Sequence, residues 1–224
     1  MDSTNDVHIR QTRQAALAFI VAAAATAVAG AVLFLILQPS TDLSDDMWRY
    51  PWESSGAFVA FTIFSTVLHA LVIVGLRAFG RSGVAGRSRA ARSGLVLVLV
   101  GTALLLVGEL ASIPVRDGLN DDTSVGIVGA IFGFGGMAST IGFLLAGWAT
   151  LRAEAWHGWR RFTPLATGLW MTAMTFIGIA APKSLHGMVG VYGLCLLAIA
   201  VALYTQPAPT APAAPARFAP LAVE

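Results

Sequence analysis

The sequence lacks the short motifs that mark several large enzyme classes. It has one cysteine, Cys195, and only 12% of its 224 residues are charged. A single cysteine can form neither a disulfide nor a multi-cysteine metal site within one chain. The HExxH, GxSxG, Walker A and CxxC patterns are also missing. Zinc protease, serine hydrolase, nucleotide-driven and thiol redox functions therefore lose most of their support.

Long apolar runs dominate the rest of the chain. Hydrophobic residues make up 56% of the sequence, and the mean hydropathy of +0.73 is well above that of a soluble domain. A transmembrane helix needs about 20 largely apolar residues. We therefore predict an all-α, polytopic integral membrane protein with six transmembrane helices. The predicted spans are residues 15–37, 56–76, 93–115, 124–149, 163–181 and 185–204.

Two short segments flank the predicted transmembrane domain of residues 15–204. Residues 1–14 are polar and are predicted to be cytoplasmic. Residues 205–224 are rich in proline and alanine, a composition typical of a disordered, polyproline-like tail. Nothing in the chain resembles a nucleic-acid-binding module, so we expect the lipid bilayer as its partner and no nucleic acid.

The distribution of charge predicts the orientation of the spans. Positively charged loops stay on the cytoplasmic side of a membrane. The loops after the second and fourth spans are rich in arginine, whereas those near residues 45 and 120 are acidic. We therefore predict a plasma-membrane protein with both termini in the cytoplasm. The first basic loop is also expected to attract anionic lipid, through Arg77, Arg81, Arg87, Arg89 and Arg92.

The third span contains one carboxylate, Glu109. A charge inside a membrane span costs roughly 2.5–3.5 kcal/mol on insertion scales, so its presence needs a reason. Helical spacing gives both the second and the third span a polar stripe on one face. Because these spans form an antiparallel hairpin, the two stripes can meet in one seam. The predicted seam residues are Thr62, Ser65, His69, Thr102, Glu109 and Ser112.

Two interpretations of this seam remain open. Glutamate and histidine inside a membrane usually face a bundle interior or an aqueous cavity, which favours a proton-linked or cation-linked pathway. Alternatively, the hydroxyl groups bond carbonyls of their own helices, and Glu109 reaches water near the end of its span. The hairpin separates His69 from Glu109 by about seven residues, or ~10 Å along the axis. We therefore expect no direct ion pair between them.

Glycines recur at helical spacing in the fourth and sixth spans. Small residues at such spacing let two helices approach closely. We predict an intramolecular packing face in the fourth span, with the sixth span as its partner. The alternative is a seam between two copies of the chain, which would make the protein a homo-oligomer. The predicted packing residues are Gly126, Gly129, Gly133, Gly136, Gly187 and Gly190.

These patterns predict a class of function without naming a reaction. We expect a non-enzymatic bundle, either a small transporter-like or ligand-binding protein or a membrane scaffold. The alternative is a membrane-embedded enzyme that acts on a lipid or hydrophobic substrate, with Glu109 and His69 as acid–base groups. We expect no metal and no cofactor. In particular, His69 and His186 are predicted to lie at different depths, which argues against a haem held between them.

Overall fold

The structure is a computed structural model that describes residues 3–206. Residues 207–224, most of the predicted tail, lie outside the described part. The described chain is helical, with one isolated β-bridge between Met47 and Leu119. Its α-helices are α1 (Ser3–Val32), α2 (Gln38–Ser40), α3 (Ser55–Arg81), α4 (Arg89–Ser112), α5 (Thr123–Ala153), α6 (Thr163–Ala180) and α7 (Leu185–Tyr204). Three short helices of other types are η1 (Leu33–Leu37), η2 (Gly158–Phe162) and η3 (Pro182–Ser184).

Six helical segments of the described residues are long and apolar enough to cross a membrane. This result confirms the predicted all-α fold and the presence of six membrane-length apolar helices. The segments are Arg10–Ser40, Ser55–Arg81, Arg89–Ser112, Thr123–Ala153, Gly158–Ala180 and Leu185–Tyr204. Several extend beyond the predicted apolar runs because a helix continues past the last apolar residue until a capping residue or a turn ends it.

Local sequence explains several helix boundaries. The hydroxyl oxygen of Ser54 accepts a hydrogen bond from the N–H of Ala57 at the start of α3, and Ser88 does the same for Ala91 at the start of α4. Serine is a preferred residue at this position because it satisfies an N–H group that has no partner within the helix. At the end of α5, Glu154 adopts a left-handed backbone conformation with φ 52°, which stops the helix.

The first span contains a π-helical turn, η1, between α1 and α2. Pro39 follows it within the same continuous helical segment. Proline in a regular α-helix would lose an N–H hydrogen bond and would press its ring against the carbonyl four residues earlier. The wider π turn offers room for this proline, so the helix continues to Ser40 instead of ending near the predicted boundary at residue 37.

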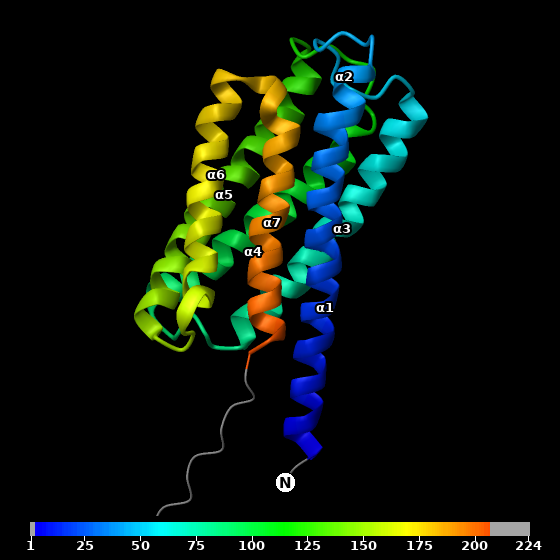
Figure 1. The fold of residues 1–224 in the computed structure, drawn as a ribbon. Helices are drawn as coiled ribbons and strands as arrows, with labels where there is room; N and C mark the ends of the chain where they lie inside the picture. The colour runs from blue at the N-terminus through cyan, green and yellow to red at the C-terminus, as the bar shows by residue number, and fades with distance from the viewer. Residues whose placement is uncertain (1–2, 207–224) are drawn as a thin grey trace, which may run out of the picture.

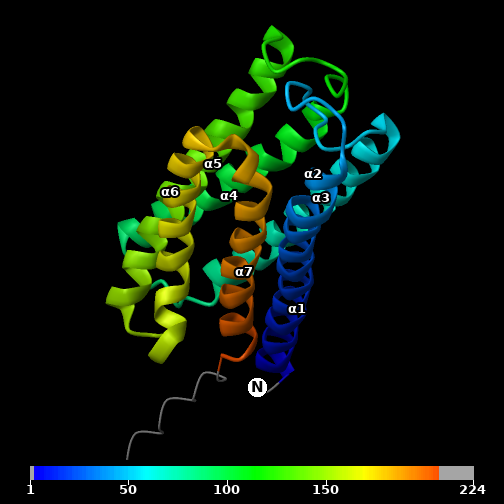
Figure 2. The same cartoon turned by 45° about the horizontal axis from the view of Figure 1, so that its top comes forward.

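The long helices form a closed ring in chain order. The main contacts join α1 to α3, α3 to α4, α4 to α5, α5 to α6 and α6 to α7, and α7 then packs against α1. Figure 1 shows α1 and α7 side by side in front of α4 and α5. In the turned view, the upper parts of α4 and α5 lean away from α6 and α7 (Figure 2). The ring is therefore tighter at its lower end.

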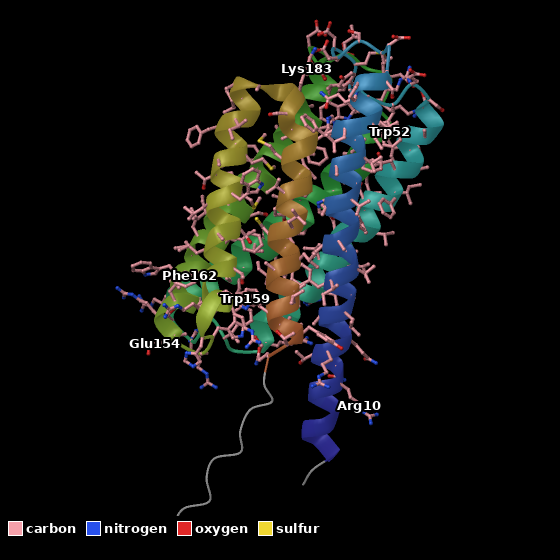
Figure 3. The ribbon with its side chains drawn as sticks, viewed as in Figure 1. Arg10, Trp52, Glu154, Trp159, Phe162 and Lys183 are labelled. Carbon is pink, nitrogen blue, oxygen red and sulfur yellow. The ribbon has the colours of Figure 1, made fainter. Side chains whose placement is uncertain are left out.

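The two ends of the ring differ in charge. We call the upper end the acidic end; it includes the connections at residues 41–54 and 113–122 and the turn at residues 181–184. We call the lower end the arginine end; it includes the connections at residues 82–88 and 154–162. Figure 3 shows Trp52 and Lys183 at the acidic end, and Arg10 and Glu154 at the arginine end.

Large apolar side chains fill the ring toward the arginine end. Phe19 of α1, Phe143 of α5 and Leu196 of α7 are at most 1% exposed. They belong to one core cluster with Leu76 and Phe79 from the last turns of α3. Leu33, Phe58 and Met188 are buried nearer the acidic end, outside this cluster.

Glycines permit a close helix contact between α4 and α5. A Cβ atom added at Gly94 would lie 2.6 Å from the backbone nitrogen of Ala146, and one added at Gly142 would lie 2.5 Å from that of Val98. Real Cβ atoms do not approach backbone so closely, so only glycine permits this backbone separation. The contact holds α4, and with it Glu109, in a fixed position in the ring.

Candidate functional site

Residues 41–54, which we call the cap, extend over the acidic end of the ring. The cap pairs with the connection between α4 and α5. The N–H of Trp48 donates to the carbonyl of Gly118 at 3.0 Å, and the N–H of Asn120 donates to the carbonyl of Asp46 at 2.8 Å. These hydrogen bonds join segments that lie far apart in the sequence, and they fix the cap on the helical ring.

Two ion pairs also hold the cap. Arg49 lies 3.2 Å from Asp117, and its side chain is only 15% exposed. Lys183, in the turn between α6 and α7, lies 2.8 Å from Asp45. The hydrogen bond from Lys183 lowers the pKa of Asp45, and the same bond raises the pKa of Lys183. The cap is thus attached to both sides of the ring.

Three aromatic residues of the cap point to three different helices. The ring centroid of Trp48 lies 6.2 Å from that of Phe132 on α5. Tyr50 lies 6.4 Å from His186 on α7, and Trp52 lies 4.9 Å from a phenylalanine of α3, Phe61. An aromatic-rich segment of this kind is typical of a headgroup-level belt. In this chain the same residues also tie the cap to the helices beneath it.

Beneath the cap, His69 of α3 and Glu109 of α4 meet. The Nδ1 atom of His69 lies 3.9 Å from an Oε1 atom of Glu109, and the two side chains are 21% and 18% exposed. The same Nδ1 lies 3.0 Å from the carbonyl oxygen of Ser65. When Nδ1 carries a proton it donates to that carbonyl, and in the neutral ring Nε2 then holds the lone pair. The pair therefore offers a carboxylate and an imidazole that can each exchange a proton.

This contact differs from the expectation that His69 and Glu109 would lie too far apart. Counting residues along the hairpin gave the separation of the backbones and ignored the direction of the side chains. In an α-helix each Cα–Cβ bond tilts toward the helix N-terminus. Because α3 and α4 are antiparallel, His69 leans toward the acidic end and Glu109 leans toward the arginine end. The two side chains therefore close most of the distance between their backbones.

The other predicted seam residues are buried on the same two helices. Thr102 is fully buried, and its hydroxyl donates to the carbonyl of Val98 at 2.8 Å. Ser112 is 3% exposed and donates to the carbonyl of Gly108. These two hydroxyl groups satisfy their own helices, which matches the structural interpretation. Thr62 and Ser65 are 1% and 8% exposed, and the carbonyl of Ser65 holds His69.

The glycines of α5 behave differently from the prediction. A Cβ atom added at any of Gly126, Gly129, Gly133 or Gly136 would meet nothing within 4 Å. The intramolecular packing predicted for this face is therefore not seen in the described chain. The physical reason is that α5 and α6 separate toward the acidic end (Figure 2), so these glycines face away from every other described helix.

The predicted glycines of α7 do pack closely, but on the helices of the first span. A Cβ atom at Gly187 would lie 3.0 Å from the ring of Phe34, and one at Gly190 would lie 3.2 Å from the carbonyl oxygen of Ala27. The sixth span is thus the partner of the first span and not of the fourth. Spacing placed these glycines on one face of the helix, but it could not identify the helix that they face.

Sequence reasoning missed two buried polar groups. Within the described chain, the hydroxyl groups of Tyr192 on α7 and Ser139 on α5 are buried and have no hydrogen-bond partner. Tyr192 occurs singly in an apolar segment, and Ser139 stands beside Thr140 in another, so neither forms a polar stripe that spacing would reveal. Among the described residues, no three histidine, cysteine, aspartate or glutamate side chains are close enough together to hold a metal ion.

Comparison of the chain with protein-family models, with curated proteins and with solved structures gives no match.

Proposed function

We propose that this chain is a small transporter-like membrane bundle in which His69 and Glu109 form a proton-exchanging site. The observation that supports the proposal is the 3.9 Å approach of the two titratable groups from neighbouring helices. Both side chains keep about a fifth of their surface exposed, so neither is sealed completely between the helices. Ionisable residues within membrane spans are costly and typically serve substrate or ion pathways.

We further infer that the acidic end faces outward and that the arginine end faces the cytoplasm of a cell bounded by its plasma membrane. The support is the positive-inside rule together with the gathering of the arginine-rich connections at one end of the ring. The start of α1 and the end of α7 lie at that same end (Figure 1). The cap then covers the outward mouth of the proposed pathway.

Proton movement in proteoliposomes tests the proposed site. The purified chain is reconstituted with an internal pH-sensitive dye, and a potassium gradient with valinomycin makes the interior negative. We expect the interior to acidify faster than in empty liposomes. Glu109→Gln should abolish the difference, because glutamine cannot exchange a proton, and His69→Gln should slow it.

Glu154→Gln is the matched control, since Glu154 is an exposed carboxylate at the opposite end of the ring. It should acidify at the wild-type rate. Wild-type protein that acidifies no faster than empty liposomes, or Glu109→Gln protein that matches wild type, would contradict the proposal.

The open face of α5 favours a second candidate, a membrane-embedded enzyme that acts on a lipid or hydrophobic substrate. Glycines whose added Cβ atoms would meet open space leave a face of α5 on which a lipid can pack, and His69 with Glu109 would supply the acid and base. Mass spectrometry of lipids extracted from proteoliposomes distinguishes this candidate. A product that forms with wild type, and not with Glu109→Gln, would favour the enzyme.

A further inference from the structure

A cavity at the arginine end lies between the α3–α4 connection and the last turns of α5. Its volume is about 240 Å³. Two buried alanines, Ala85 and Ala149, contribute to its lining. Gly86 has a left-handed backbone with φ 74°, and a Cβ atom there would lie 3.2 Å from the side chain of Ala153. Small side chains therefore create the hollow.

Two arginines line this cavity from different parts of the chain. Arg87 comes from the α3–α4 connection and Arg152 from the last turn of α5. The guanidinium of Arg152 lies 4.8 Å from the centre of the Trp148 ring. This stacking orients the guanidinium and leaves its N–H groups free to bind an anion.

Neither arginine has an acidic partner among the described side chains. The ion pairs found there involve Arg49, Arg116 and Lys183 at the acidic end, and His69 inside the ring. Two uncompensated guanidinium groups on one cavity attract an anion. Arginine binds phosphate particularly well because its planar fork can donate two parallel hydrogen bonds.

The remainder of the cavity lining is consistent with a lipid. Alanines make up much of the lining, and Trp148 beside it is 50% exposed. Half-exposed tryptophan is typical of the boundary between headgroups and acyl chains. The cavity thus places cationic groups beside an apolar surface at the level where a phospholipid headgroup would lie.

We propose that this cavity binds the headgroup phosphate of an anionic phospholipid, with Arg87 and Arg152 as its two cationic contacts. An anionic headgroup is favoured over phosphatidylcholine, because the choline group carries a positive charge that both guanidinium groups repel. The prediction from sequence named five arginines of one loop, of which Arg87 lines the cavity. The structure adds Arg152 and Trp148 from a separate helix.

Binding of short-chain lipids to the purified full chain tests this site. The chain in neutral detergent is titrated with dioctanoyl phosphatidylglycerol, with dioctanoyl phosphatidylcholine, and with inorganic phosphate as a competitor. We expect phosphatidylglycerol to bind more tightly than phosphatidylcholine. Arg87→Gln/Arg152→Gln should weaken phosphatidylglycerol binding about tenfold or more, given the usual contribution of each arginine to anionic-lipid binding.

Two further variants separate the cavity from general charge. Arg10→Gln/Arg13→Gln removes the same charge from exposed positions at the same end outside the cavity, and it should change affinity less than about twofold because solvent screens charges that do not contact the ligand. Ala153→Leu keeps every arginine and fills the hollow, so it should weaken binding as strongly as the loss of both cavity arginines.

Equal losses of affinity for phosphatidylglycerol in the two arginine double variants would overturn the proposal and indicate diffuse attraction by surface charge. Unchanged affinity in Ala153→Leu protein would overturn the role of the cavity. Displacement of phosphatidylglycerol by millimolar inorganic phosphate would overturn the lipid as the ligand and point to a soluble phosphate compound.

Discussion

His69 and Glu109 are residues that packing alone would not select. A buried pair must lose its hydration, and the attraction between the two groups often fails to repay that cost. The 3.9 Å separation is also too long for a hydrogen bond. The attraction between the two side chains therefore offsets little of the free energy that their desolvation costs. Groups that lower stability in this way are typically retained for function.

We expect the double variant His69→Leu/Glu109→Leu to be at least as stable as wild type. Replacement of a buried pair by apolar residues of similar volume is often neutral or stabilising by about 1–4 kcal/mol. His69→Leu alone should be less stable than the double variant, because it leaves the carboxylate without its neighbour. Thermal unfolding in detergent measures these differences. A double variant less stable than either single variant would indicate a structural pair.

Asp45 and Lys183 should hold the cap over a wide range of pH. Because the pKa of Asp45 is lowered, its contribution to stability is present at a pH above the ordinary pKa of aspartate. This contribution is lost as the pH falls through the lowered pKa. Because the pKa of Lys183 is raised, its contribution to stability is present at a pH below the ordinary pKa of lysine. This contribution is lost as the pH rises through the raised pKa. From about pH 5 to pH 10 the ion pair should therefore persist.

Amide hydrogen exchange measures this attachment of the cap. After correction for intrinsic rates, the N–H groups of Trp48 and Asn120 should keep constant protection across that range. Asp45→Asn should reduce their protection at neutral pH, and high salt should reduce it in the wild type because the pair is exposed. Asp42→Asn, which removes a cap carboxylate outside both ion pairs, should leave protection unchanged. Equal protection in the Asp45 and Asp42 variants would contradict the role of the pair.

At the scale of elements, the contact between α4 and α5 depends on glycine, because a side chain at Gly142 would meet the backbone of α4. We expect Gly142→Ala to destabilise the protein by about 1–3 kcal/mol, because the added methyl group would force the two backbones apart. Gly133→Ala is the matched control on the same helix. It should be neutral or slightly stabilising, since its Cβ atom meets open space and alanine favours helix. Thermal unfolding of both variants measures the contrast, and equal losses would contradict the close approach of the two backbones at Gly142.

The spans themselves could be predicted from sequence, but their contacts could not. Hydropathy placed the last span at residues 185–204, which is the observed extent of α7. It ended the fourth span near residue 149, although α5 continues to Ala153. Apolar composition identifies a helix that can enter lipid, and it contains no information on which neighbour a small residue faces. The glycines of α5 and α7 were therefore predicted to pack against each other, whereas those of α7 pack on the first span and those predicted on α5 meet no helix.

The two residues of the candidate site were proposed from sequence alone, and the distance predicted between them was wrong. Helical spacing selected His69 and Glu109 because a polar stripe is visible in a single helix. Their contact depends on the opposite lean of side chains on antiparallel helices. The cap was missed for another reason: its pairing joins Met47 to Leu119, and hydrogen bonds between such distant segments leave no periodic signal in the sequence.

For the whole molecule, cysteine labelling tests the proposed orientation. In a Cys195→Ala background, Ser44→Cys places a thiol in the cap and Ser82→Cys places one at the arginine end. We expect a membrane-impermeant maleimide to label position 44 in intact cells, and to label position 82 only after the membrane is opened. The expectation follows from the positive-inside rule. The reverse pattern would invert the orientation.

The ring in chain order has a consequence for how the molecule is made. Each span packs against the one synthesised just before it, so most of the structure can assemble stepwise as the chain emerges. The contact of α1 with α7 is the exception, because it needs the last span. Until α7 arrives, Gly30 of α1 lacks the backbone of Gly190 that it finally meets. The first span thus lacks its second neighbour until the last span has been synthesised. A chain cut before residue 185 would leave the ring of helices open.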